Sequence, residues 1–291
     1  MSRRGWFLFI LSGFLWGIPY LFIRIAVRDF SPAAIVFARV AIGAAILIPL
    51  SVRSGTLKIA LRGYKYIALY SLTEIVGPWF LITRAETKIS SGLTGLLVAT
   101  VPIWSTIFAS LYGDKTVWHH KRLIGIVVGF IGVIALVGIE SLSGDSDFMS
   151  ILAVLLASIG YGYAVNMISK KLPGVSGVAI NAVAMAMAAI LYAPFAFNQW
   201  PRGAVSTSAL VSLLALGIFP TAIAFIVFFA IMEEIGAARG SLVTYLNTAF
   251  AVLLGILILS EPLTLGIAIG LPMVLFGSYL ASRKPAESKA N

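Results

Sequence analysis

The chain has 291 residues, of which 60% are hydrophobic and 11% charged, and its mean hydropathy is +1.01. Soluble domains carry about 25% charged residues, so this composition excludes a cytosolic enzyme, a disordered protein and a secreted disulfide scaffold. The sequence also contains no cysteine, which excludes disulfides and thiolate metal sites. We therefore predict an integral membrane protein, and we interpret its net charge of +10 from the positions of the basic residues.

Apolar runs long enough to cross a bilayer recur along the whole chain. A hydrocarbon core about 30 Å thick requires roughly 20 residues of α-helix. The predicted spans are Trp6–Ile25, Ala33–Val52, Tyr66–Thr83, Gly92–Leu111, Leu123–Ile139, Met149–Ile168, Gly177–Asn198, Ala209–Ile231, Gly240–Ser260 and Thr264–Ala281. Runs such as Leu152–Ile159 lack the alternation of a membrane β-strand. The predicted fold class is all-α, a polytopic membrane protein with ten transmembrane helices.

The first predicted span follows Ser2-Arg3-Arg4, a basic start that cleavable secretion signals and twin-arginine signals share. The apolar stretch is long for a signal sequence, and Arg24 and Arg28 follow it instead of a small-residue cleavage site. We therefore predict that this segment stays in the protein as its first membrane span.

The basic residues are distributed unequally between the two sides of the predicted membrane. If the N-terminus is cytoplasmic, 15 Lys and Arg residues fall inside and five fall outside. Cytoplasmic loops carry such an excess, and the acidic loop Glu140–Asp147, which has no Lys or Arg, falls outside. We predict a multi-pass protein of the cell inner (cytoplasmic) membrane with both termini in the cytoplasm and with contacts to anionic lipid headgroups.

The two halves of the sequence resemble each other when the chain is aligned with itself at an offset of 145 residues. The aligned features are Trp16-Gly17 with Tyr161-Gly162, Pro49 with Pro194, Phe80 with Phe225, Gly95 with Gly240, Leu97-Val98 with Leu242-Val243, Ile124-Gly125 with Ile269-Gly270 and Gly132 with Gly277. Each half contains five predicted spans, and an odd number makes the second half enter the membrane from the opposite side, as in secondary transporters with inverted repeats. We predict one five-helix repeat in residues 1–145 and a second, inverted one in residues 146–291. The alternative is that helices rich in Leu, Val and Gly align by composition alone.

Short motifs recur at positions typical of one transporter family. They are Leu15-Trp16-Gly17, Phe37-Ala38-Arg39, Val101-Pro102, Gly113-Asp114 and Ser260-Glu261. On these motifs the chain resembles the drug/metabolite transporter superfamily, in its EamA-type ten-helix branch, over nearly its whole length. Within that branch it most resembles the aromatic amino-acid exporters. It departs from the family pattern at Asn247, where the first repeat has Pro102, and at Asp114, where the family usually has glutamate.

Two ionisable side chains lie clearly inside predicted spans, Arg39 and Glu74. A charge at the bilayer centre costs about 2.5–3.5 kcal/mol on the insertion scale, so each of them should face a partner or water. One interpretation is a structural Arg39–Glu74 pair. The other is that Glu74 faces a cavity and binds a substrate ammonium group or a proton. Both remain open from the sequence.

Aromatic, amide and proline residues inside the predicted spans are candidates for a substrate cavity. Buried tyrosine hydroxyls require hydrogen-bond partners, and a proline inside a helix frees the carbonyl four residues earlier. The candidate cavity residues are Trp16, Glu74, Pro78, Trp79, Pro102, Trp104, Tyr161, Tyr163, Asn166, Thr221, Tyr245 and Asn247. Such a cavity suits a zwitterionic or neutral metabolite with an apolar or aromatic side chain. The alternative is ordinary packing and hydrogen bonding between helices.

Small residues at four-residue spacing predict where helices approach closely in lipid. Gly13/Gly17 and Ser158/Gly162 have this spacing and match at the repeat offset, so we predict that spans 1 and 6 pack symmetrically near the centre. Gly125/Gly129 and Gly266/Gly270 mark spans 5 and 10, whose glycine-rich faces pack either within or between protomers. The sequence is therefore compatible with a monomer or a homodimer.

Enzyme chemistry has no candidate residues inside the predicted spans. The two histidines, His119 and His120, lie in a predicted loop, and the sequence contains no HExxH motif, no intramembrane aspartate pair and no glycine-rich nucleotide loop. We predict no enzyme activity, no cofactor and no metal. A channel is disfavoured because an inverted repeat without a ring of filter residues favours a carrier.

We predict a secondary transporter that exports amino acids, aromatic and other neutral ones, or similar small metabolites by alternating access. Its predicted partners are the small-molecule substrate and membrane lipids, and not nucleic acid. The alternative is a multidrug or other metabolite efflux carrier, with or without proton coupling. Exchange of cationic drugs for protons is expected to use a buried carboxylate, for which Glu74 is the candidate.

Overall fold

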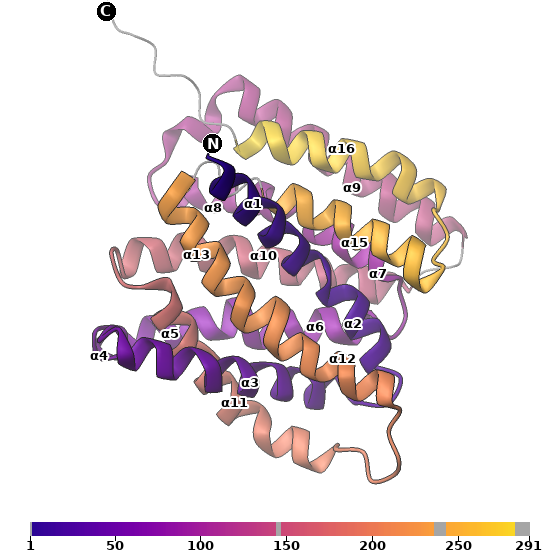
Figure 1. Cartoon of the computed structure of the whole chain (residues 1–291). Coiled ribbons are helices and arrows are strands. Elements are labelled where there is room, and N and C mark those ends of the chain that lie inside the picture. The colour runs from indigo at the N-terminus through magenta and orange to yellow at the C-terminus, as the bar shows by residue number, and fades with distance from the viewer. Residues whose placement is uncertain (1, 144–146, 236–242, 283–291) are drawn as a thin grey trace, which may run out of the picture.

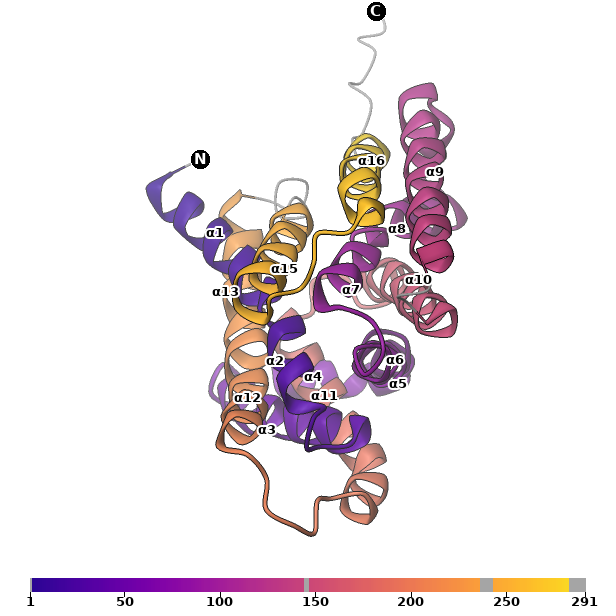
Figure 2. The ribbon, with the colours of Figure 1, turned by 90° about the vertical axis from the view of Figure 1, so that its right-hand side faces the viewer.

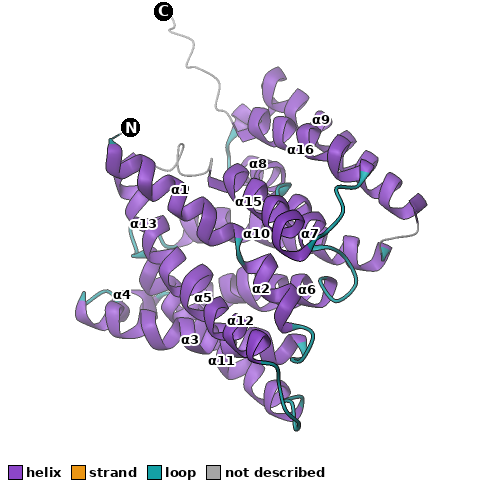
Figure 3. Cartoon of the chain, turned by 45° about the vertical axis from the view of Figure 1, so that its right-hand side comes forward, coloured by secondary structure: helices purple, strands orange, loops and turns teal. Residues whose placement is uncertain are grey.

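The protein is a bundle of helices, and the axes of the long helices are roughly aligned, with α1 and α13 more steeply inclined (Figure 1). The structure, a computed structural model, describes residues 2–143, 147–235 and 243–282. Within these ranges the chain forms helices joined by short connections and contains no strand (Figure 3). The all-α prediction is therefore confirmed for the described part of the chain.

The helices follow the predicted apolar runs closely. In the first half they are α1 (Arg3–Gly17), α2 (Pro19–Ala26), α3 (Pro32–Arg53), α4 (Leu57–Arg62), α5 (Tyr64–Tyr70), η1 (Ser71–Val76), α6 (Gly77–Ala85), α7 (Ser91–Val98), α8 (Val101–Leu111), η2 (Lys115–Trp118) and α9 (His120–Ser143). In the second half they are α10 (Phe148–Lys171), α11 (Gly177–Asn198), α12 (Thr207–Gly217), η3 (Ile218–Ile223), α13 (Ala224–Ile235), α15 (Val243–Leu259) and α16 (Leu265–Ser282).

Seven helical segments of the described chain are long and apolar enough to cross a membrane. They are Arg3–Ala26, Pro32–Arg53, Tyr64–Ala85, Ser91–Leu111, Phe148–Lys171, Gly177–Asn198 and Thr207–Met232. Two shorter apolar helices, Val243–Leu259 and Leu265–Ala281, follow them. Large apolar side chains cover the outside of the bundle, for example Ile190, which is 76% exposed. A polytopic membrane protein is therefore confirmed, and the count of ten spans remains a prediction.

Two of the predicted boundaries need comment. The predicted fifth span lies within α9, which continues to Ser143, so the acidic segment predicted as a loop from Glu140 begins inside that helix. The predicted ninth span starts at Gly240, and residues 236–242 lie outside the described part of the chain. The helix that follows them starts at Val243.

Polar side chains define where many of the helices begin. The first four N–H groups of a helix have no partner within it, and Ser, Thr, Asp or Asn at the cap accepts a hydrogen bond from one of them. The capping side chains are those of Ser2, Ser31, Ser90, Asp147, Ser176 and Ser206. Each lies at the edge of an apolar run, which explains why the sequence located the spans well.

The cap at Asp147 carries a prediction about acid stability. The hydrogen bond from the Ser150 hydroxyl, and then the one from Lys88, hold the pKa of Asp147 below its ordinary value of 3.8. Because the folded-state pKa is the lower one, this stabilisation is complete above the unfolded pKa and is lost as the pH falls through the folded pKa. We expect Asp147→Asn to keep the cap but to flatten the fall in melting temperature between about pH 5 and about pH 3. Equal slopes for the variant and the parent in detergent would contradict this assignment.

Helices from the two halves of the chain pack against each other in pairs. The main pairs are α9 with α16, α3 with α11, α1 with α15, and α10 with both α6 and α8. Figure 2 shows α9 and α16 together on one side of the bundle and α3 with α11 on the other. The centre is occupied by α7, all eight residues of which are buried. The interior is therefore assembled from both halves rather than from two separate units.

The predicted small-residue positions Gly17, Gly129 and Gly162 are places where two helices approach each other closely. A Cβ added to Gly277 would lie 2.3 Å from the backbone N of Gly129, where α16 crosses α9. A Cβ at Gly17 would lie 2.4 Å from Phe250 Cβ, and one at Gly162 would lie 2.7 Å from the backbone N of Ser105. A small residue of α1 thus packs closely against α15, and one of α10 packs closely against α8.

Candidate functional site

Two spans are interrupted by π-helical turns at matching places. The segments Ser71–Val76 and Ile218–Ile223 begin 147 residues apart. Glu74 lies in the first segment and Thr221 occupies the same position in the second. Single π-helical turns are rare in proteins, and those that occur are often found at functional sites. A proline accompanies each one, Pro78 just after the first and Pro220 inside the second, and its missing N–H prevents a regular α-helix there.

The Arg39 side chain connects α3 to η3 and to α6. Its side chain extends from the middle of α3, and the residue is only 8% exposed. Its Nε donates a hydrogen bond to Thr221 Oγ1 at 2.7 Å, and its guanidinium carbon lies 3.6 Å from the ring centroid of Trp79 on α6. The Thr221 hydroxyl itself donates to the Leu216 carbonyl at 2.7 Å. A neutral hydroxyl and an aromatic face thus hold the buried cation.

A tyrosine and a carboxyl group complete this site. Tyr161, which extends from α10, lies near Trp79 and within electrostatic range of both Glu74 and Arg39. Glu74 is half-buried, and its Oε2 atom has no hydrogen-bond partner in the described part of the chain. We call Arg39, Glu74, Trp79, Tyr161 and Thr221 the Arg39 cluster.

The structure does not pair Arg39 with Glu74, although each lies within electrostatic range of Tyr161. The ion pairs among the described residues are Arg4–Glu234, Lys88–Asp147 and Arg122–Asp114, and none joins Arg39 to Glu74. Arg39 and Glu74 therefore belong to one cluster through Tyr161, and the carboxyl group within electrostatic range of Arg39 is that of Glu86.

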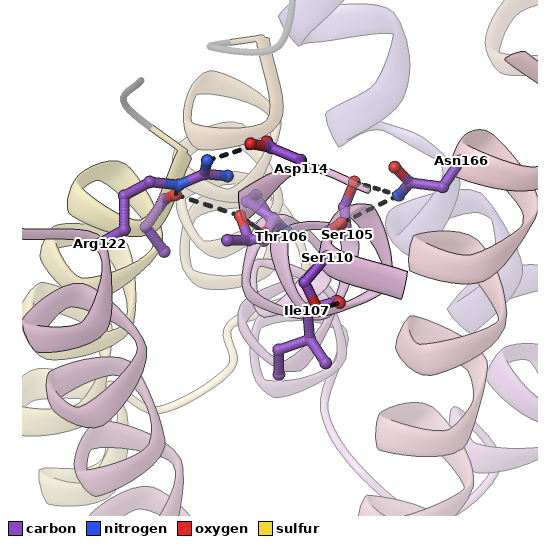
Figure 4. Close-up of polar contacts among 9 residues, drawn as sticks. Ser105, Thr106, Ile107, Ser110, Asp114, Arg122 and Asn166 are labelled. Carbon is purple, nitrogen blue, oxygen red and sulfur yellow. Dashed lines mark hydrogen bonds and ion pairs between the residues drawn. The ribbon is translucent and has the colours of Figure 1, made fainter. Parts of the chain in front are cut away.

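A second group of predicted residues ties α8 to α10. The Asn166 amide nitrogen donates to the Ser105 carbonyl at 3.0 Å, to the Ser105 hydroxyl at 2.9 Å and to the Gly162 carbonyl at 2.8 Å (Figure 4). Trp104 donates from Nε1 to the Thr100 hydroxyl at 3.3 Å. Tyr163 packs edge-on against Phe108, with ring centroids 5.5 Å apart. The described contacts of these side chains join helices.

Other predicted residues take part in ring packing or in helix breaks. Trp16 packs against Phe228 with ring centroids 4.4 Å apart, and Tyr245 packs against Tyr279 at 6.3 Å. Asn247 is buried, and its Oδ1 accepts a hydrogen bond from the Thr248 hydroxyl at 3.3 Å. Pro102 is at the start of α8, directly after the break that separates it from α7. Pro78 is buried at the start of α6, next to the Arg39 cluster.

Sequence reasoning missed Glu86, which follows the last residue of α6. Its side chain is 0% exposed, and both carboxyl oxygens lack a hydrogen-bond partner in the described residues. The signal was its spacing, because Trp79, Ile82 and Glu86 lie on one face of the helix at three- and four-residue intervals. The neighbouring Arg84 and Lys88 made the segment look like an exposed loop.

Arg122 was also missed, since the sequence placed it among cytoplasmic loop cations. It is 4% exposed, and its Nη1 lies 3.0 Å from Asp114 Oδ2 (Figure 4). Its Nε donates to the Ala281 carbonyl at 2.9 Å, and Thr106 donates to the same carbonyl at 3.1 Å. Arg122 therefore joins the start of α9 to the end of α16.

A cavity of about 520 Å³ opens at one end of the bundle. It is lined by Thr56, Ile59, Gly174, Val175, Ser176, Gly177, Val178, Phe229 and Met232. These residues belong to the start of α4, the connection between α10 and α11, and the last part of α13. None of them was among the predicted site residues.

An apolar helical bundle of this kind, with buried ionisable groups where interrupted helices meet, defines a polytopic membrane transport protein. The sequence profile of the EamA-like transporter family matches residues 3–138 and again residues 148–283. The chain therefore belongs to the EamA-like transporter family, and the predicted superfamily resemblance is confirmed at that level.

Relatives named as transporters match this chain over nearly their whole length. The uncharacterized transporter YoaV of Bacillus subtilis is 27% identical over 271 residues, which cover 91% of this chain and 92% of YoaV. An uncharacterized transporter of Archaeoglobus fulgidus is 25% identical and covers 97% and 99%. The uncharacterized inner membrane transporter YedA of Escherichia coli is 26% identical and covers 93% and 90%. These relatives indicate a transporter rather than an enzyme.

One solved crystal structure of a protein has the same fold. It superposes with a TM-score of 0.64 and covers 96% of this chain and 98% of the other, at 17% sequence identity. At that identity the likeness concerns the fold alone.

Proposed function

We propose that the protein is a secondary transporter that exports amino acids, aromatic and other neutral ones, or similar small metabolites across the cell inner membrane by alternating access. The observation that carries this proposal is the Arg39 cluster. A buried guanidinium and a partner-free carboxyl oxygen lie beside two aromatic rings, where interrupted helices of both halves meet. YedA, a relative named as an inner membrane transporter, supports the location.

The proposed architecture is ten spans arranged as two inverted repeats, residues 1–145 and 146–291. The family profile matches once in each half. The two π-helical segments begin 147 residues apart, and the main helix pairs each combine one helix from each half. An inverted repeat places the binding site between the halves near the midplane, which agrees with a cluster that draws on α3, α6, α10 and η3.

An amino acid has the chemistry that this cluster offers. The planar guanidinium of Arg39 suits a carboxylate, and its present neighbours Thr221 and Trp79 carry no negative charge that would compete. The Glu74 carboxyl suits an ammonium group, and its Oε2 is not used by any described residue. The rings of Trp79 and Tyr161 provide flat surfaces for an apolar or aromatic side chain.

The proposed topology also assigns the two ends of the bundle. With a cytoplasmic N-terminus, the cavity of about 520 Å³ beside α4 and α13 lies on the cytoplasmic side. A substrate would enter there on its way to the Arg39 cluster. Both termini then lie in the cytoplasm.

The second candidate function is efflux of lipophilic cations. The unpartnered Oε2 of Glu74 favours it, because a buried carboxylate beside aromatic rings also suits an organic cation. Uptake of a labelled neutral amino acid into proteoliposomes, in competition with a panel of amino acids and lipophilic cations, separates the two functions. Competition by aromatic and neutral amino acids supports the first proposal, and competition by the cations alone supports the second.

We expect Glu74→Gln to lower the initial rate of amino-acid uptake into proteoliposomes at least about tenfold and to flatten its pH dependence. The amide keeps the size of the side chain but removes the negative charge that would bind ammonium. The matched control is Glu234→Gln, which changes an exposed carboxyl group outside the cluster. Unchanged uptake with an unchanged pH profile in Glu74→Gln would overturn the assigned role.

A further inference from the structure

Glu86 is a titratable group that the proposed binding site does not use. It lies one residue beyond the span that ends at Ala85, and its side chain is 0% exposed. Neither carboxyl oxygen has a hydrogen-bond partner in the described residues. Burying an ionised carboxylate without hydrogen bonds is far more costly than burying a neutral carboxyl group. The surroundings of Glu86 in this conformation therefore suit the protonated form.

Two of the charged side chains near Glu86, Arg24 and Glu261, make hydrogen bonds to atoms other than the Glu86 carboxyl oxygens. Arg24, on α2, donates from Nη1 to the backbone carbonyl of Glu86 and not to its carboxyl group. Glu261, beyond α15, accepts hydrogen bonds from Ser91 N at 2.8 Å and from Gly92 N at 3.0 Å, at the start of α7.

Two further groups complete these surroundings. Tyr20, on α2, is buried within electrostatic range of Glu86. Arg39, on α3, is also in range and hydrogen-bonds to Thr221. Burial raises the pKa of Glu86 well above its ordinary value, Glu261 raises it further, and Arg24 and Arg39 lower it.

Contacts between connecting segments close the bundle around this residue. Asp29, between α2 and α3, accepts a hydrogen bond from Ser206 N at the start of α12, at 2.8 Å. Lys88, between α6 and α7, donates to Asp147 at the start of α10, at 3.1 Å. The cavity of about 520 Å³ lies elsewhere, beside α4 and α13. Glu86 is thus enclosed at a closed end of the bundle, which the proposed topology places outside.

We propose that Glu86 is a proton-binding site, and that this end of the bundle closes with the Glu86 carboxyl group protonated and opens when it ionises. The proton comes from water on the outer side and returns to it when the end opens. This inference rests on the proposed transport function for its purpose, because alternating access requires each end to open in turn. The binding of a proton to Glu86 on closure does not depend on which substrate the protein carries.

The absence of cysteine in the sequence allows a direct test. Ala85→Cys introduces a thiol next to Glu86 at a position only 1% exposed, so a water-soluble maleimide reaches it when this end opens. Thr87→Cys, at an exposed position, corrects for the effect of pH on thiol reactivity. The experiment measures the ratio of the two labelling rates in proteoliposomes without substrate, between about pH 5 and about pH 8.

We expect this ratio to rise at least about tenfold with pH when Glu86 is present. With Glu86→Gln, which mimics the neutral carboxyl group, we expect it to stay low at every pH. Glu86→Asp keeps an ionisable group and should restore the rise, which distinguishes titration from a packing defect. A ratio independent of pH, or the same rise in Glu86→Gln, would overturn the proposal. Because no substrate is present, neither result depends on the outcome of the amino-acid uptake experiments.

Discussion

Arg39→Ala is expected to reduce amino-acid uptake into proteoliposomes at least about 100-fold, a loss of about 2.7 kcal/mol of transition-state or binding free energy. The substitution removes the hydrogen bond to Thr221 at 2.7 Å and the contact with the Trp79 ring at 3.6 Å. It also removes the buried cation of the proposed site. Loss of that cation leaves Glu74 without an opposite charge in the cluster, so a zwitterion would no longer be held at both ends.

Arg39→Lys distinguishes a binding role from a purely structural one. Lysine keeps the charge but loses the planar guanidinium and its Nε donor. We expect a folded protein with a melting temperature near that of the parent and an uptake rate lowered at least about tenfold. The matched control is Arg53→Lys at the exposed end of the same helix, which should transport like the parent. If Arg39→Lys took up amino acids at the parental rate, the role of Arg39 would depend on its positive charge alone and not on its planar guanidinium group.

Gly277→Leu is expected to destabilise the protein by at least about 3 kcal/mol, with loss of monodisperse protein in detergent. A Cβ at this position would lie 2.3 Å from the backbone N and 2.5 Å from the Cα of Gly129. Backbone atoms cannot rotate away as a side chain can, so α16 would have to move away from α9. The expected effect is therefore on the fold as a whole rather than on binding alone.

Gly138→Leu provides the control for this experiment. Gly138 is also a helical glycine of α9, and a Cβ added there meets nothing within 4 Å. We expect the Gly138 variant to keep the parental melting temperature and elution profile. If Gly277→Leu also kept the parental melting temperature and elution profile, α9 and α16 would not be in close backbone contact at Gly277.

The site combines interrupted helices with rigid ones. The spans that carry Glu74 and Thr221 contain π-helical turns, whereas α3, which carries Arg39, is continuous from Pro32 to Arg53. Irregular backbone at membrane depth is tolerated where protein or a cavity surrounds it. Arg39, on a continuous helix, thus contacts both spans that contain π-helical turns, through Thr221 and Trp79.

Much of the fold followed from local patterns in the sequence. Gly177–Asn198 was predicted and found with the same ends, because an apolar run with a serine cap can satisfy its backbone in lipid only as a helix. Gly17 and Gly129 were predicted as packing positions from small-residue spacing alone. Trp79, Tyr161 and Thr221 were all predicted as site residues, since polar groups on apolar spans are unusual.

The partners of these side chains were decided only by the tertiary structure. Helical period identifies the face on which a residue lies, but not which distant helix covers that face. Arg39 therefore looked like a partner for Glu74, whereas it bonds to Thr221, 182 residues away. Glu86 looked like a loop residue because its neighbours are charged, and only the tertiary structure shows that it is fully buried, with Arg24 of α2 bonded to its backbone carbonyl.

The sequence by itself thus determined that this is a helical membrane protein, where most of its helices begin and end, and which positions bring backbones together. These properties depend on interactions between residues close in the chain and between the chain and lipid. The tertiary structure decided which side chains contact Arg39 and that Glu86 is fully buried. These contacts form between elements that are far apart in the sequence, and no local pattern specifies how such elements pack together.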